Sequence, residues 1–254
     1  MNRLMLLAGL LVLGLVADAR ADIMTPSGLA PGDQFREVFV TITTTPATSS
    51  NISFYDSIVQ ANAVSGGLAT YNGSPVTWET LGSTASVSAV SRLPMDNIPI
   101  YLPNGTEVAT GGAALWATTQ TTNPLLSAID EYSNGTSTPA GGSANVWTGT
   151  NSNGSAGTSE FGTLGDSSTI TTLGASSATF STWVEQFGFN QSASLSLYGF
   201  SEVLTVPTPS TATPEPASIT LVLTGVGGLV GFCLARRGRR ASSAALAAPP
   251  QSHS

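Results

Sequence analysis

The chain has 254 residues, of which 41% are hydrophobic and only 9% charged, with a formal net charge of −7 and one cysteine. This length suits one domain with terminal extensions, and the scarcity of charge beside 27 glycines and 15 prolines predicts a turn-rich, β-rich chain. Internal disulfides are excluded because Cys233 has no partner, and Ser-His-Asp or Cys-His catalytic sites are excluded because the only histidine is His253.

The first 21 residues have the pattern of a secretory signal peptide. Arg3 is followed by an apolar run over 4–16, which is too short to cross a bilayer comfortably, and then by alanines at alternate positions over 17–21. We expect cleavage after Ala21, with cleavage after Ala19 as the alternative. The rest of the chain is therefore expected to be exported.

The exported body, residues 22–206, is expected to begin with a strand and a helix. Alternating apolar residues over 36–44 predict a half-buried strand. Its apolar positions are Val38, Val40 and Ile42. Residues 51–63 predict the only substantial helix of the body, capped by Ser49 or Ser50. Its apolar face is formed by Phe54, Ile58 and Ala61, with Tyr55 and Val59 beside it.

Shorter elements are expected along the rest of the body. Trp78 and Leu81 predict a short helical turn, and residues 148–182 are expected to be mostly loop because 28 of these 35 residues are Gly, Ser, Thr, Asn or Ala. The other expected elements are a hairpin of 97–102 and 106–110 around Pro103-Asn104-Gly105, helical turns within 125–132, a strand at 145–148 and a closing strand within 193–206. Strands near both ends and one early helix predict an α+β domain whose terminal strands pair.

Several blocks of the body resemble a family of secreted bacterial proteins with a C-type-lectin-like, endostatin-like fold. The blocks are Glu37–Thr41, Pro99–Tyr101, Asn104–Thr106, Val108–Ala109, Asp130–Glu131, Val146–Thr150 and Asn153–Gly154. The most specific block is Trp147-Thr148-Gly149-Thr150, and the resemblance covers roughly residues 35–205. It implies a lectin-like fold with long loops. The chain departs from the lectin pattern because it has no disulfides, and it also lacks the Glu-Pro-Asn and Trp-Asn-Asp triplets of calcium-dependent sugar-binding lectins.

Candidate ligand residues in the body are few. Asp130 and Glu131 are adjacent and lie near Asn134, and oxygen ligands of this kind suit calcium. A solvated acidic turn is the alternative interpretation. Trp147 and Asn153 complete the candidate ligand set, with the tryptophans interpreted either as core or as a sugar-stacking platform. Six Asn-x-Ser/Thr sequences are interpreted as turns.

A second apolar segment, residues 217–235, contains no charge over 19 residues and is long enough to cross a membrane as a single transmembrane helix. An arginine cluster follows it and predicts that this end stays in the cytoplasm. The cluster consists of Arg236, Arg237, Arg239 and Arg240. Before the segment stands the tripeptide Pro214, Glu215 and Pro216, separated from the body by a Pro/Thr/Ser linker over 207–213.

The order of tripeptide, apolar helix and arginine cluster over 214–240 resembles the PEP-CTERM sorting signal of exported bacterial proteins. The resemblance implies that an exosortase, a membrane-embedded cysteine transpeptidase, processes the chain near the motif and passes the body to the cell surface or the exterior. Such signals usually stop soon after the basic cluster, whereas residues 241–254 add a tail that we expect to be disordered. A plain single-pass membrane anchor is the alternative.

These patterns predict a non-enzymatic exported protein of the cell surface or extracellular matrix that binds extracellular polysaccharide and needs no cofactor. Residues 22–213 carry two arginines and thirteen acidic residues, a net charge of −11, which excludes nucleic acid as a partner of the body. One alternative is a secreted carboxylate glycoside hydrolase that uses acids such as Asp130, Glu131 or Glu160. Another is an adhesion module stabilised by calcium.

Overall fold

The computed structural model describes residues 22–116, 125–138, 144–157 and 161–209. All but the last of these residues belong to one compact unit that ends at Thr208. The expected signal peptide, sorting motif, apolar segment, arginine cluster and tail lie outside the described residues, as does Glu160. Within the described ranges, no helix is long and apolar enough to span a membrane.

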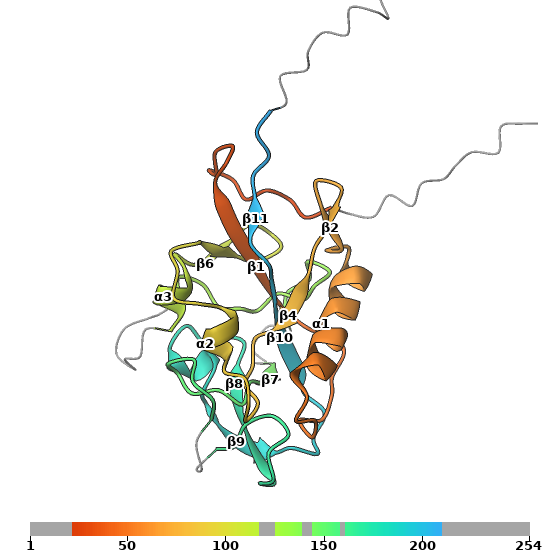
Figure 1. Cartoon of the computed structure of the whole chain (residues 1–254), viewed down its shortest axis with the longest axis vertical. Coiled ribbons are helices and arrows are strands. Elements are labelled where there is room, and N and C mark those ends of the chain that lie inside the picture. The colour runs from red at the N-terminus through yellow and green to blue at the C-terminus, as the bar shows by residue number, and fades with distance from the viewer. Residues whose placement is uncertain (1–21, 117–124, 139–143, 158–160, 210–254) are drawn as a thin grey trace, which may run out of the picture. The chain divides into compact units, whose positions relative to one another are not determined.

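The unit is a mixed α+β fold, mostly sheet with few helices, which confirms the expected class (Figure 1). A nine-stranded sheet has the order β6-β5-β1-β10-β7-β8-β9, with β11 also paired to β1 and β4 also paired to β10, and β2 and β3 form a separate hairpin. The strands are β1 (Gln34–Val40), β2 (Thr70–Tyr71), β3 (Ser74–Pro75), β4 (Trp78–Thr80), β5 (Ile100–Tyr101), β6 (Glu107–Ala109), β7 (Asn145–Trp147), β8 (Ile170–Ala175), β9 (Phe187–Asn190), β10 (Ser196–Ser201) and β11 (Leu204–Thr205). The helices are α1 (Ile52–Gly66), α2 (Ala89–Arg92), α3 (Gly112–Leu115) and the 3₁₀ turn η1 (Ser181–Trp183).

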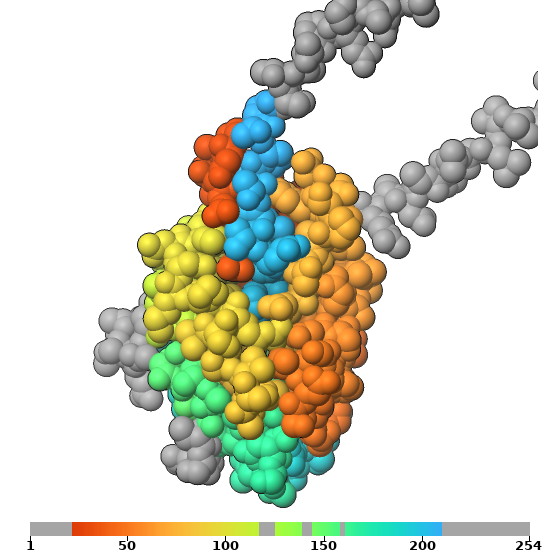
Figure 2. All heavy atoms as spheres, in the orientation of Figure 1, coloured from red at the N-terminus to blue at the C-terminus, as the bar shows by residue number. Residues whose placement is uncertain are grey.

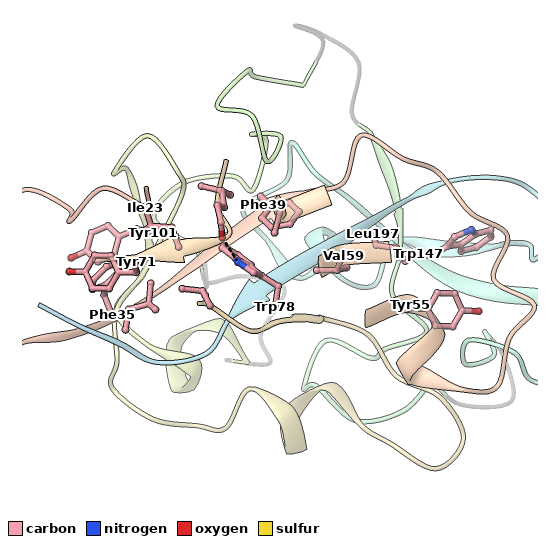
Figure 3. Packing of buried hydrophobic residues seen from close by; sticks show 14 of the residues in the cluster. Ile23, Phe35, Phe39, Tyr55, Val59, Tyr71, Trp78, Tyr101, Trp147 and Leu197 are labelled. Atoms are coloured by element: carbon pink, nitrogen blue, oxygen red, sulfur yellow. Dashed lines mark hydrogen bonds between the residues drawn. The ribbon is translucent and has the colours of Figure 1, made fainter. Parts of the chain in front are cut away.

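Strand β1 is buried on both faces, so the prediction of a half-buried strand is wrong. Phe35 and Phe39 belong to a core cluster that includes Tyr55, Val59 and Ala63 of α1, which we call the α1 cluster. Figure 3 shows Phe39 close to Trp78 in this cluster, with ring centroids 4.8 Å apart. Successive side chains of a strand point to opposite faces, so the intervening residues face a second core. Val38 and Val40 join this second cluster with Ala89 and Leu115, and we call it the α2–α3 cluster.

The two ends of the body pair as expected. β1 runs antiparallel to β10, with Val38 opposite Phe200, and antiparallel to β11, with Phe35 opposite Leu204. The expected hairpin also forms, because β5 pairs antiparallel with β6 across a turn in which Gly105 has a φ of +85°. These pairings place β1 and β10 in the middle of the sheet.

Two predicted elements differ from the structure, and a third is incomplete. Trp78 lies in strand β4 rather than in a helical turn. The segment 125–132 contains no helix, and its last residue, Tyr132, forms a parallel bridge with Val40. The described part of 148–182 is mostly loop as expected, but it also contains the strand β8, which is largely buried, and the start of the turn η1. Threonine is a good strand former, and Thr172 in β8 is buried with its hydroxyl donating to the carbonyl of Phe161 at 3.0 Å.

Helix α1 is the longest helix of the described residues, but its cap and its buried face differ from the prediction. Asn51 caps the helix through its Oδ1, which accepts the backbone N–H of Ser53 at 3.1 Å, so capping by Ser49 or Ser50 is wrong. The buried residues are Tyr55, Val59, Asn62 and Ala63, whereas Phe54 and Ala61 are exposed and Ile58 is only partly buried. Asn62 replaces an apolar residue because its Oδ1 accepts the backbone N–H groups of Ile42 and Thr43.

Candidate functional site

The structure does not bring the five predicted ligand residues together. Trp147 is fully buried in the α1 cluster, and its indole N–H donates to the carbonyls of Thr45 and Ala193 at 3.1 and 3.2 Å. The other three tryptophans are buried to the same extent, at 0–1% exposure. The alternative that the tryptophans form an exposed sugar-stacking platform is therefore wrong, and Trp147 is not placed to contact a ligand.

Asn134 and Asn153 are exposed, but their side-chain oxygens hold turns. Each Oδ1 accepts both the backbone N–H and the hydroxyl of the residue two positions later, Thr136 or Ser155. Five of the six Asn-x-Ser/Thr asparagines accept the backbone N–H of the residue two positions later, which supports their interpretation as turns, except that Asn51 caps helix α1. They are Asn51, Asn104, Asn134, Asn153 and Asn190.

Asp130 and Glu131 do not form an exposed acidic pair. Glu131 is only 2% exposed, whereas Asp130 is partly exposed, because the segment is extended and neighbouring side chains point to opposite sides. The backbone N–H of Val40 donates to the Glu131 carbonyl at 2.8 Å, and the backbone N–H of Asn104 donates to Glu131 Oε2 at 3.3 Å. Glu131 is thus built into the sheet beside β1, so the alternative of a solvated acidic turn is wrong for Glu131.

Glu37 on β1 is the acidic residue that the sequence interpretation missed. Its side chain is 1% exposed within the run of buried residues from Phe35 to Val40. Burial raises the pKa of the Glu37 carboxyl well above its usual range, and the nearby Glu131 raises it further. Burial also raises the pKa of Glu131, although the hydrogen bond from Asn104 opposes this shift. The sequence does show an acid within the predicted strand, directly before the apolar residues Val38 to Val40.

Both arginines of the described residues are held in internal ion pairs. Arg36 Nη2 lies 3.2 Å from Asp96 Oδ2, and Arg92 Nη2 lies 3.0 Å from Asp56 Oδ2 and 3.1 Å from Glu79 Oε1. The chain has no lysine, so the surface of the described unit offers no unpaired lysine or arginine to an acidic ligand. Among the described residues, no group of three or more His, Cys, Asp or Glu side chains could hold a metal.

Exposed aromatic side chains lie on β9, which is the edge strand at one end of the sheet. Phe187 and Phe189 are 39% and 45% exposed, and their ring centroids lie 6.4 Å apart. The strand carries no charge, ends at Asn190 and is followed by Gln191 and Ser192. We call Phe187 and Phe189 the β9 patch. The strands β8 and β9 form the end of the unit opposite β11 (Figures 1 and 2).

A hollow of about 220 Å³ lies elsewhere, between the β2–β3 hairpin and the segment 202–205. Glu202 is its only acidic lining residue. Neither Glu131 nor Asp130 reaches it, so this hollow does not join the predicted site residues.

No model of a known protein family matches the chain, and no curated protein matches it.

Proposed function

We propose that the protein is an exported, non-enzymatic component of the cell surface or extracellular matrix whose body binds neutral extracellular polysaccharide through the β9 patch. The observation that carries the binding role is the pair of exposed phenylalanines, Phe187 and Phe189, on an uncharged edge strand. Aromatic rings pack against the apolar faces of sugar rings, while amide and hydroxyl side chains bond to the sugar hydroxyls.

The charge distribution favours a neutral polysaccharide over an acidic one. Arg36 and Arg92 are both occupied by carboxylates inside the body. An acidic polysaccharide would therefore meet a surface on which nearly every charge is negative, and like charges repel. A neutral polysaccharide is not repelled by these negative charges.

The route to the surface rests on the two ends of the chain. The proposed signal peptide and the PEP-CTERM-like segment over 214–240 support export and sorting by an exosortase-like transpeptidase. The β9 patch lies at the end of the unit opposite β11, from which the chain continues toward residue 214.

The lectin-like fold is part of the same proposal. It is supported by the α+β class, by the central pairing of β1 with β10 and by the place of α1 directly after β1. The Trp147-Thr148-Gly149-Thr150 block lies in the interior, where the Thr148 hydroxyl donates to the carbonyl of Val184 at 2.6 Å. We assign this block a structural role. The hydrolase alternative has less support, because Asp130 and Glu131 do not face a common cleft.

Polysaccharide binding is tested by electrophoresis of the protein through gels that contain either a neutral glucan or a polyuronate. We expect the neutral glucan to slow the wild-type chain and the polyuronate to leave its mobility unchanged. The double variant Phe187→Ala/Phe189→Ala should lose the retardation, since the stacking surface is removed. Phe54→Ala on α1 is the control, because Phe54 is also exposed, at 44%. Equal retardation of the double variant and the wild type would show that the β9 patch does not bind the polysaccharide.

Sorting is tested by mass spectrometry of the protein recovered from the cell surface. We expect the surface form to lack the arginine cluster 236–240, because an exosortase-like enzyme cuts near the tripeptide. A variant with Pro214→Ala and Pro216→Ala should remain in the membrane fraction at full mass. A surface form that still ends at Ser254 would contradict this route and favour a plain anchor.

A further inference from the structure

Glu37 and Glu131 lie on the same face of the sheet and form a buried carboxyl pair. Val40 pairs with Tyr132 in a parallel bridge, and both contact the α2–α3 cluster. Side chains alternate along a strand, so Glu37, like Phe39, points to the face opposite Val40. Glu131, next to Tyr132, points to the same face as Glu37, which is the face covered by α1. Glu37 is opposite Tyr101 of β5, and Glu131 binds the N–H of Asn104 just beyond β5. Both carboxyl groups are thus enclosed by β1, the β5–β6 hairpin and the segment 130–138.

Three oxygen atoms in this region are buried without a hydrogen-bond partner. They are Glu37 Oε2, Glu131 Oε1 and Ser133 Oγ. Ser133 is 1% exposed and lies in the turn that follows Glu131, in which the backbone N–H of Gly135 donates to the carbonyl of Tyr132 at 3.0 Å. Its Cβ approaches the end of α1, because a Cβ added to Gly66 would lie 2.8 Å from it. A buried polar atom without a partner costs free energy, so such a group of oxygens requires a ligand or a proton.

No cationic side chain of the described unit compensates this pair. Arg36 and Arg92 bind other carboxylates, and the chain has no lysine. The titratable groups near the pair are themselves acidic or phenolic. They are Asp130, which raises the pKa of Glu131, and Tyr101, whose own neighbours are Glu107 and Asp33. Two carboxylates buried together need a positive charge from outside the chain, or must take up a proton.

We propose that Glu37 and Glu131, together with the hydroxyl of Ser133, bind a hard divalent cation of the calcium type. Carboxylate and hydroxyl oxygens are the donors that such cations prefer, and one ion satisfies all three unpartnered atoms at once, which a single shared proton does not. Backbone carbonyls and water complete the coordination shell. This site differs from the one expected from the sequence, since it uses Glu37 and Ser133 in place of Asp130 and Asn134.

The site would join β1 to the segment 130–138, which lies beside it in the sheet. A site with two carboxylates is expected to bind calcium with a dissociation constant of about 10⁻⁴ to 10⁻³ M, the range of extracellular calcium modules. An exported body meets such concentrations, whereas the cytoplasm does not supply them. The inference does not depend on polysaccharide binding, which is tested on different residues.

The experiment measures thermal unfolding of the full chain at pH 8, with either EDTA or increasing calcium. We expect calcium to raise the wild-type Tm by about 3 to 6 °C at ten times the dissociation constant. Glu37→Gln should lose this response, while in EDTA it should be at least as stable as the wild type, because the amide buries no charge. Asp130→Asn is the matched control, since it removes the adjacent acid on the opposite face and should keep the response.

Glu131→Gln provides a second test in case the first variant does not fold, and calcium binding is also measured directly by titration calorimetry. A wild-type Tm that calcium does not change would overturn the proposal and assign the pair to a shared proton. A calcium response that persists in both glutamine variants would place the cation elsewhere on the acidic surface.

Discussion

Replacing Trp147 by alanine is expected to lower the free energy of unfolding by about 3 to 5 kcal/mol. The side chain is completely buried in the α1 cluster, so alanine leaves a large cavity. It also removes the indole N–H that binds the carbonyls of Thr45 and Ala193. These carbonyls belong to the segments that follow β1 and precede β10, so Trp147 fastens β7 to the two terminal parts of the body. Urea unfolding followed by far-ultraviolet circular dichroism measures the loss.

Phe189→Ala is the matched control for this substitution. Its ring lies 6.5 Å from that of Trp147, but its side chain is 45% exposed, so we expect a loss below about 1 kcal/mol. The two variants should also separate in binding, because only Phe189 belongs to the β9 patch. If Trp147→Ala unfolds at the same urea concentration as the wild type and loses glucan retention, Trp147 is a ligand residue after all.

The sequence predicted the parts of the fold that local pattern determines. The strand around Val38, the helix after Asn51 and the Asn-Gly turns all follow from short-range signals, and each lies within a few residues of its predicted place. The pairing of the first and last strands also followed, because apolar strand patterns stood near both ends of an otherwise polar body.

The errors about which side chains are buried share one physical cause. A face of a strand or helix becomes buried only when another segment of the chain packs on it. Val38 and Phe39 are both buried because helices cover both sides of β1, and a strand by itself does not reveal this. For the same reason the buried stripe of α1 follows Tyr55 and Val59 rather than Phe54. The strand β8 is not predicted because residues 148–182 are mostly Gly, Ser, Thr, Asn and Ala, although a hydrogen-bonded threonine such as Thr172 is readily buried in a sheet.

The candidate sites were harder to predict than the fold, because they depend on contacts between distant segments. Glu37 and Glu131 are 94 residues apart in the chain and meet only because the segment 130–132 pairs with β1. Asn134 was an attractive calcium ligand by residue type, yet its oxygen binds the turn that it occupies. The sequence shows which side chains carry oxygen atoms that could bind a cation. It does not show which of these atoms lack a hydrogen-bond partner in the folded chain.

The second large effect is expected at Gly174, in strand β8. A Cβ at this position would lie 1.9 Å from the carbonyl oxygen of Trp183 and 2.9 Å from the Cα of Val184. These contacts are with the backbone of η1, which cannot turn away as the end of a side chain can. The carbonyl of Trp183 also accepts the hydroxyl of Tyr198 at 3.0 Å, in the α2–α3 cluster. Alanine therefore forces η1 away from the sheet and strains this buried hydrogen bond.

We expect Gly174→Ala to lower the free energy of unfolding by about 3 kcal/mol, at the upper end of the usual cost of overpacking. Gly188→Ala on the neighbouring strand β9 is the control, because the atoms nearest to its added Cβ belong to the side chains of Ile170 and Phe161 and not to the backbone. Those side chains lie near the surface and can move, so the loss should be about 1 kcal/mol. Neither glycine has a positive φ, so both substitutions test space and not backbone conformation. Equal losses for the two variants in urea unfolding would mean that η1 does not pack against β8 as closely as described.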